Sequence, residues 1–130
     1  MSTLHPVLKQ AVTHTQLVRY AGASGDFNPI HTVVPAAEQA GLGGVIAHGM
    51  LIMGMAGEAL TQWFSRKQLR SFKVRFSEMT RPGERLTIEG RLLNQVERNG
   101  EQQAKGELIV KNEAGEVKLK GDFEVALSPS

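Results

Sequence analysis

Apolar and polar residues alternate along the second half of the chain. Between residues 71 and 126 the alternation recurs in four runs, with the period of strands that bury one face. The apolar positions of these runs are Phe72, Val74 and Phe76; Leu86 and Ile88; Leu108 and Val110; and Val117, Leu119, Phe123 and Val125. Turn-forming pairs separate the runs at positions 82 and 83, 99 and 100, and 114 and 115. The pattern predicts an antiparallel meander of four strands.

The first half of the chain predicts shorter elements. Residues 8–12 fit a short strand, and a threonine–glutamine capping box begins at Thr13. A short helix should follow the box and end at the glycines Gly22 and Gly25. A second short helix is predicted over residues 35–39, with proline at its start and glycine just past its end.

One longer helix is predicted over residues 49–64, where the sequence GMLIMGMAGEALTQWF carries a single charge, Glu58. A helix that is apolar around nearly its whole circumference belongs inside a protein, and this one is too short to cross a membrane. It should therefore lie against the concave face of a curved antiparallel sheet. Gly54 and Gly57 lower helix propensity, which indicates that a strand, a partner helix or a substrate approaches the backbone closely.

Composition limits the class of protein. The 130 residues fit one domain, and 41% hydrophobic and 22% charged residues are typical of a folded globular chain. The chain has no cysteine, signal-peptide pattern or membrane-length apolar run, so a cytoplasmic location without disulfides is expected. Acids and bases alternate around a net charge of +2, and aromatic residues are few, so neither nucleic acid nor membrane is an expected partner.

The segment SGDFNPIH, residues 24–31, contains the first candidate chemistry. Asp26 and His31 are five positions apart in a stretch that Pro29 keeps out of regular helix, so their side chains can converge. Dehydration of a 3-hydroxyacyl thioester needs a base for the C2 proton and an acid for the leaving hydroxyl, and this pair can supply both. Asp26 and Asn28 before a proline also fit a purely structural turn equally well.

The segment AHGM, residues 47–50, stands where the apolar helix begins. The Gly49 N–H has no acceptor within the helix, so it could stabilise an enolate-like thioester oxygen. His48 could contact the substrate, but a helix cap or a hydrogen bond to a buried carbonyl explains it better. Met50, Met53 and Met55 fit core packing, and their flexible side chains also suit an acyl-chain tunnel.

Metal binding and a second catalytic base are two other uses that these residue types allow. Asp26, His31 and His48 could ligate zinc, but no HxxxH or HxH spacing supports a metal site, so none is expected. Glu58 could be a second base, although such a residue more often faces solvent or pairs with a cation. It is left without an assigned role.

The two segments together resemble a known family. YAGASGDFNPIH at 20–31, followed by IAHGM at 46–50 and the apolar helix, is similar to the MaoC-like hydratases and dehydratases of the hot-dog fold. The sequence looks especially similar to R-specific enoyl-CoA hydratases and to the catalytic subunit of mycobacterial (3R)-hydroxyacyl-ACP dehydratases. The resemblance implies an α+β chain, with one MaoC-like hot-dog domain over residues 1–130 and a curved sheet wrapped around a long buried helix.

The resemblance also implies roles for particular residues. Asp26 and His31 would activate the water, Asn28 would hold the loop or assist the acid, and the Gly49 N–H would bind the thioester oxygen. No metal or redox cofactor is implied, since the acyl chain is carried on CoA or on the phosphopantetheine of an acyl carrier protein. A homodimer, or a heterodimer with another hot-dog subunit, is implied. Some R-specific hydratases have serine where Gly54 stands, which leaves a hydroxyl contact to the substrate in doubt.

The expected reaction is the reversible interconversion of a (3R)-hydroxyacyl thioester with a trans-2-enoyl thioester and water. Two alternatives remain open. A hot-dog thioesterase would hydrolyse the thioester and leave the double bond intact. A non-catalytic acyl-binding subunit of a heterodimeric dehydratase would not need both Asp26 and His31.

Overall fold

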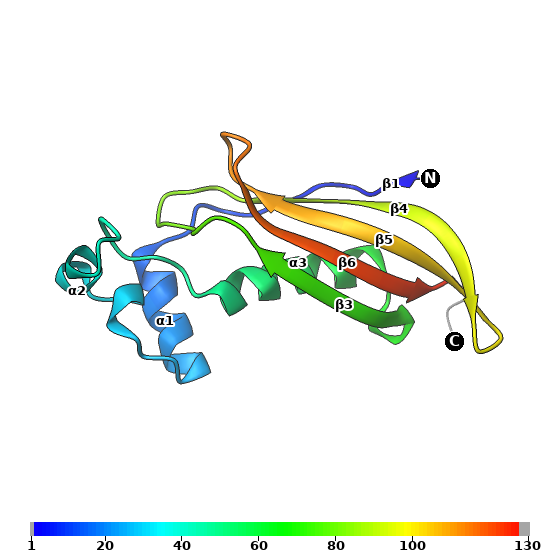
Figure 1. Cartoon of the computed structure of the whole chain (residues 1–130), viewed down its shortest axis with the longest axis horizontal. Coiled ribbons are helices and arrows are strands. Elements are labelled where there is room, and N and C mark those ends of the chain that lie inside the picture. Colours follow the sequence, from blue (N-terminus) through cyan, green and yellow to red (C-terminus); the bar gives the residue numbers. More distant parts are fainter. Residues whose placement is uncertain (1, 128–130) are drawn as a thin grey trace.

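The computed structural model describes residues 2–127 and consists of one antiparallel sheet with helices on one side (Figure 1). The strands, in chain order, are β1 (Ser2–Thr3), β2 (Val7–Leu8), β3 (Leu69–Phe76), β4 (Thr87–Arg98), β5 (Glu101–Lys111) and β6 (Val117–Ala126). The helices are α1 (His14–Ser24), the 3-10 turn η1 (Pro29–His31), α2 (Val34–Gln39), α3 (Gly49–Trp63) and the 3-10 turn η2 (Arg66–Gln68).

The prediction of a four-stranded meander is correct for its last three strands and wrong for its first. Strands β4, β5 and β6 are consecutive neighbours, and Asn99 and Gly100 join the first two with positive φ angles of 51° and 78°. Strand β3 instead pairs with β6 at the opposite edge of the sheet from β1 and β2. The turn at Pro82 and Gly83 therefore lies in a connection between non-adjacent strands. Alternation predicts strands but not which strands pair.

The helices of the first half were predicted closely. Thr13 Oγ1 accepts a hydrogen bond from the Gln16 N–H at 3.0 Å, and α1 ends at Gly25, whose φ is 77°. Gly22 lies within α1 and does not end it. The strand predicted over residues 8–12 is wrong except at Leu8, although the chain there still runs beside the start of β4 through the bond from Lys9 N–H to the Leu86 carbonyl.

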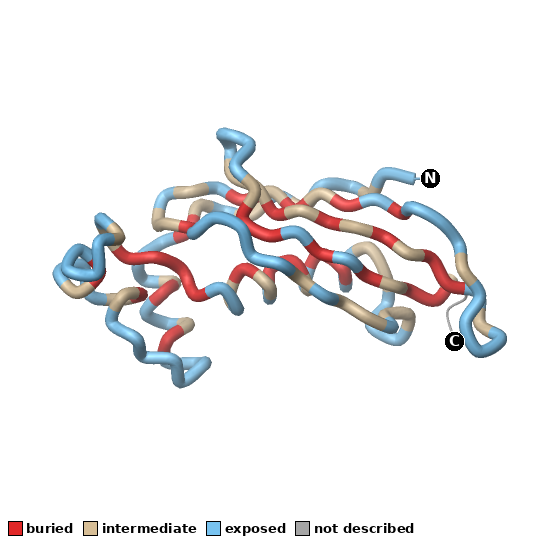
Figure 2. The backbone as a smooth tube through the Cα atoms, viewed as in Figure 1, coloured by how far each residue is buried: buried red, intermediate tan, exposed pale blue. Residues whose placement is uncertain are grey.

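Helix α3 lies beneath the curved sheet, as the apolar pattern predicted (Figure 1). Its buried residues are Ile52, Met55, Ala56, Ala59 and Leu60. The described residues leave the opposite side of the helix uncovered (Figure 2). Met50 is 60% exposed, and a Cβ on Gly54 or Gly57 would meet nothing within 4 Å. No described part of this chain therefore makes the close approach that the two glycines indicated. Within residues 2–127, no helix is long and apolar enough to span a bilayer.

Aromatic rings of the core lie over glycines of the sheet. The Phe123 ring covers Gly106, and a Cβ at Gly106 would lie 2.2 Å from that ring. Trp63, at the end of α3, covers Gly90 in the same way, with 2.7 Å from a Cβ there to the indole. Only glycine leaves room for a ring this close to a strand.

We expect Gly106→Ala to destabilise the fold, because Phe123 is fully buried and cannot move aside. Overpacking of this kind costs about 1–3 kcal/mol in the free energy of unfolding, measured by urea denaturation. Gly22→Ala is the matched control, since a Cβ there meets nothing within 4 Å and alanine favours helix. Equal stability of Gly106→Ala and wild type would contradict this packing.

Candidate active site

The loop after α1 is built from side chains that bond to their own backbone. Asp26 Oδ1 accepts from the Asn28 N–H at 3.2 Å, and Asn28 Oδ1 accepts from the Ile30 N–H at 3.3 Å. The structural reading of this segment as a turn is therefore correct, and Asn28 holds the loop. The turn leaves Asp26 Oδ2 available for chemistry, since the side chain is 56% exposed.

The His31 ring is buried and fixed at one nitrogen. Its Nδ1 lies 2.8 Å from the Ile46 carbonyl oxygen. A carbonyl only accepts, so Nδ1 carries the hydrogen in the neutral ring. Nε2 is then the atom with the free lone pair, available to take a proton.

His48 contacts both members of the predicted pair. It is buried, its Nε2 lies 2.9 Å from the Asp26 backbone carbonyl, and its ring stacks on His31 with centroids 3.7 Å apart. The ring edge of Tyr20, from α1, packs against it at 4.9 Å. Of the two structural explanations, the buried carbonyl is correct, whereas His48 makes no side-chain cap of α3. His48 therefore lies in contact with both Asp26 and His31.

Asp26, His31 and His48 come together in space although their spacing matches no metal motif. One ligand-type atom from each residue lies within 4.8 Å of the other two. A metal must lie close to the plane of each imidazole that binds it, about 2.1 Å from the nitrogen. The two rings are only 23° from parallel, so their planes do not meet within that distance of both. The stacked rings therefore do not suit binding of one metal ion by both.

Gly49 is the first residue of α3, so its N–H is one of the helix amides without an acceptor in the helix. The Phe76 ring lies 3.3 Å from where a Gly49 Cβ would be, so glycine permits this contact. Phe76 itself was predicted to be buried but is 52% exposed, because it ends the edge strand β3.

A partly open cavity of about 220 Å³ lies between η1, the start of α3, the end of β3 and β6. Its lining residues are His31, Ile46, Ala47, Gly49, Ile52, Phe76, Ser77, Glu78, Met79, Thr80 and Lys118. Met50, predicted as a substrate contact, is not among them and points to solvent.

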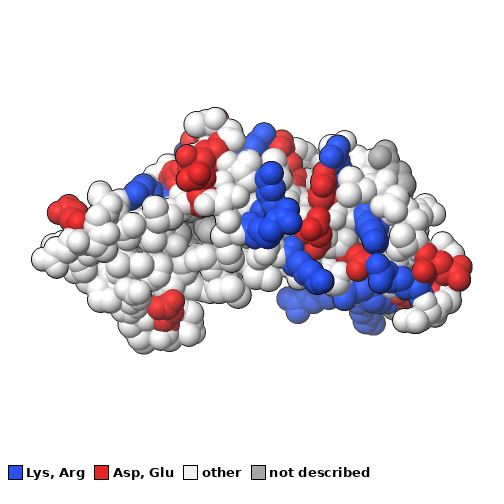
Figure 3. Space-filling view, in the orientation of Figure 1, with Lys and Arg blue, Asp and Glu red and all other residues white. Residues whose placement is uncertain are grey.

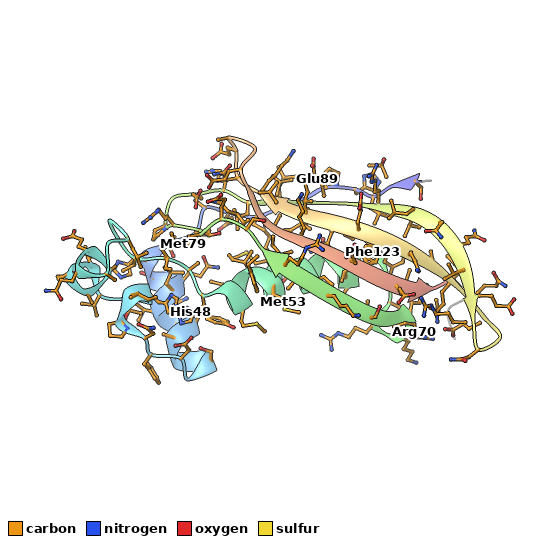
Figure 4. The ribbon with its side chains drawn as sticks, viewed as in Figure 1. His48, Met53, Arg70, Met79, Glu89 and Phe123 are labelled. Atoms are coloured by element: carbon orange, nitrogen blue, oxygen red, sulfur yellow. The ribbon has the colours of Figure 1, made fainter. Side chains whose placement is uncertain are left out.

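The segment after β3, which lines the cavity, is held in place by hydrogen bonds. The Thr80 carbonyl accepts from the Ala47 N–H at 2.8 Å, which holds the segment after β3 beside the start of α3. The neighbouring Met79 carbonyl accepts from Lys118 Nζ, also at 2.8 Å. In Figure 4, Met79 and His48 both lie beyond the left end of β3, at the end of the molecule with α1.

Lys118 is buried because β6 has an extra residue there. Val110 pairs with Leu119 and Lys111 with Val117, so Lys118 forms a bulge that turns its side chain inward. Its ammonium pairs with Glu84 at 2.8 Å and with Glu116. Burial alone would lower the pKa of Lys118, but the hydrogen bonds to the two carboxylates outweigh it and raise the pKa. Sequence reasoning missed this residue, since its alternation places it on the polar face.

Glu58 has an ordinary role. It pairs with Lys9, which confirms one of the two common explanations for an acid on this helix. Met55 is buried in the core and Met53 is half-buried, so only packing is shown for them.

Comparison with known proteins identifies the family of this chain. Residues 2–115 match the family described as "MaoC like domain". The fatty acid synthase beta subunit pkiC of Emericella nidulans is 35% identical over 109 residues, which are 82% of this chain and 6% of that protein. The probable enoyl-CoA hydratase 2 of Dictyostelium discoideum is 33% identical over 86 residues, which are 64% of this chain and 29% of that protein. The chain thus spans only a small part of these relatives.

Solved structures confirm the predicted hot-dog fold. A MaoC-like dehydratase superposes with a TM-score of 0.86 at 26% identity, covering 98% of this chain and 40% of the other. The (R)-hydratase from A. caviae involved in PHA biosynthesis gives 0.81 at 19% identity, with 98% of both chains covered. The ChsH1–ChsH2 complex from Mycobacterium tuberculosis gives 0.82 at 16%, covering 98% and 96%. With a family match over residues 2–115 and the fold of these neighbours, the chain belongs to the MaoC-like family of hydratases and dehydratases.

Proposed function

We propose that the chain interconverts a (3R)-hydroxyacyl thioester and a trans-2-enoyl thioester plus water, without a metal or redox cofactor. The observation that carries the proposal is the convergence of Asp26 with His31, because His31 lines a cavity that Gly49, the first residue of α3, also lines. Acid–base groups and an oxyanion donor at one cavity are what this reaction needs.

In the hydration direction, the water adds its hydroxyl to C3 and one proton to C2. Asp26 Oδ2 accepts a hydrogen bond from the water and orients it. His31 Nε2 takes the proton that leaves the water and returns it to C2, so both residues end the cycle as they began. The charge that develops on the thioester oxygen is stabilised by the Gly49 N–H. Concentrations of substrate and product set the direction.

The surface charge favours an anionic acyl carrier. Lys and Arg gather over β3 and β6, whereas the end of the molecule with α1 and α2 carries few charges (Figure 3). Arg75 and Lys120 are direct cross-strand partners, a like-charge pairing that is unfavourable in isolation. The phosphates of CoA, or the acidic surface of an acyl carrier protein, would reduce the repulsion between these two side chains.

One assay separates this reaction from the alternatives. Crotonyl-CoA and longer enoyl-CoAs are incubated with the protein while enoyl absorbance and free thiol are followed in parallel. We expect absorbance to fall without thiol release. Thiol release with the double bond intact would favour the thioesterase. Binding without either reaction would favour the acyl-binding subunit.

We also propose that a second hot-dog subunit covers the open side of α3. Met50, Gly54 and Gly57 follow one another at four and three positions, so they share a face of the helix. That face is apolar and exposed, and its glycines leave room for close approach of another chain. The ChsH1–ChsH2 neighbour is itself a complex, which supports pairing of such subunits.

Gly54→Gln tests this pairing. The wild type should have twice the 14.2 kDa mass of one chain in sedimentation, and Gly54→Gln should dissociate at higher concentration because its side chain occupies the contact. Gly22→Gln is the matched control, since Gly22 is also a helical glycine with open space around it. A monomeric wild type would rule out the homodimer and leave only a heterodimer. Equal association of the two variants would place the contact elsewhere.

A further inference from the structure

The Thr80 side chain has no partner although it is buried. Its exposure is 3%, and within residues 2–127 no hydrogen-bond partner is in reach of Thr80 Oγ1. Buried polar side chains are hydrogen-bonded in the large majority of cases, so an exception needs an explanation. The described residues include other buried side-chain atoms without a hydrogen bond, on His48, Gln103 and Glu124, of which the Glu124 oxygen is ion-paired with Arg98, but only Thr80 lines the cavity of the site.

Thr80 is held in place by its backbone and its neighbours. Its carbonyl accepts from Ala47, two residues before Gly49, and the preceding Met79 carbonyl is bound by the buried Lys118 ammonium. On the other side, the Arg81 N–H donates to Glu84 at 2.6 Å. The backbone at Thr80 is therefore fixed beside the segment that leads into α3, and such preorganisation is what oxyanion donors need.

We propose that the Thr80 hydroxyl donates the second hydrogen bond to the thioester oxygen, together with the Gly49 N–H. This inference rests on the proposed hydration reaction. The hydroxyl can donate a hydrogen bond, has no acceptor among residues 2–127, and belongs to a residue that lines the same cavity as Gly49. When the hydroxyl of water adds to C3, negative charge moves to the thioester oxygen, and two donors stabilise it better than one.

Thr80→Val and Thr80→Ser form the test. Valine has the same shape without the hydroxyl, so we expect kcat for crotonyl-CoA to fall about 10²-fold, as for loss of one oxyanion donor. Serine keeps the donor and should keep most of the activity. Removal of an unpartnered buried hydroxyl should leave Tm equal or higher, so an activity loss in Thr80→Val cannot come from unfolding. Wild-type kcat in Thr80→Val would overturn the proposal.

A spectroscopic readout separates this proposal from the hydration reaction itself. Crotonyl-CoA labelled with ¹³C at the thioester carbonyl is bound to Asp26→Asn and to Asp26→Asn with Thr80→Val, and the carbonyl stretch is compared. We expect a higher frequency in the double variant, since one donor is lost. Equal frequencies would overturn the role of Thr80 even if the wild type hydrates. A frequency difference in a protein without hydratase activity would contradict the proposed function alone. Failure of crotonyl-CoA to bind either variant would contradict both.

Discussion

Replacing Asp26 by asparagine should lower kcat for hydration by about 10²- to 10⁴-fold while the protein remains folded. Asparagine retains an oxygen that accepts from the Asn28 N–H, so the turn is kept. It lacks the negative charge that orients and polarises the water. His31→Asn should have a loss of similar size, since its amide N–H can still donate to the Ile46 carbonyl but nothing replaces Nε2.

Asp122→Asn is the matched control for these variants. Asp122 is an exposed acid on β6, where it is the cross-strand neighbour of Lys73, and it does not belong to the cluster of Asp26, His31 and His48. Its variant should keep wild-type kcat and Tm. A hydration rate in Asp26→Asn or His31→Asn equal to that of Asp122→Asn would mean that the pair does not carry the reaction.

Lys118→Met should have the largest effect on stability among single changes at the site. The methionine fits the space but leaves Glu84 and Glu116 without their cation. Removing one partner of a buried ion pair costs about 3–5 kcal/mol in the free energy of unfolding. The matched control is Lys111→Met, on the neighbouring strand, where the pair with Glu89 at 3.0 Å is partly exposed. That pair should contribute about 1 kcal/mol or less.

The pH dependence of this difference follows from the pKa shifts. Burial alone would raise the pKa of Glu84, but the hydrogen bonds from Lys118, the Arg81 N–H and Asn112 lower it. A carboxyl with a lowered pKa in the folded state stabilises above its unfolded pKa of about 4.3 and loses this contribution as pH falls through the folded value. Lys118, with a raised pKa, loses its contribution only as pH rises through its folded value.

The stability gap between wild type and Lys118→Met should therefore be widest near neutral pH and close toward acid. The ion pair would be contradicted if the difference in the free energy of unfolding stayed the same at acid pH. It would also be contradicted if adding Glu84→Gln to Lys118→Met restored no stability.

The features predicted best from sequence depend on local patterns. The largely apolar run gives α3 with the correct start at Gly49, and Asn99 with Gly100 gives the hairpin between β4 and β5. The turn around Asp26 and Asn28 is also local, because each side chain bonds backbone two residues further on.

The features missed depend on contacts between distant segments. Pairing of β3 with β6 instead of β4 is a choice between strands with similar alternation. The bulge at Lys118 changes which face a lysine occupies, and no residue type marks it. The stack of His48 on His31 requires α3 and the loop after α1 to meet, so spacing alone could not reveal that these rings lie in contact.

Hydration in heavy water tests the central claim most directly. The wild-type protein is incubated with crotonyl-CoA in D₂O, and the product is analysed for its C3 configuration, deuterium at C2 and free thiol. We predict a (3R)-3-hydroxybutyryl thioester with one deuterium at C2 and no thiol release, and no such product from a variant carrying both Asp26→Asn and His31→Asn. The same product formed at the wild-type rate by that double variant, or free thiol with the double bond intact, would contradict the account.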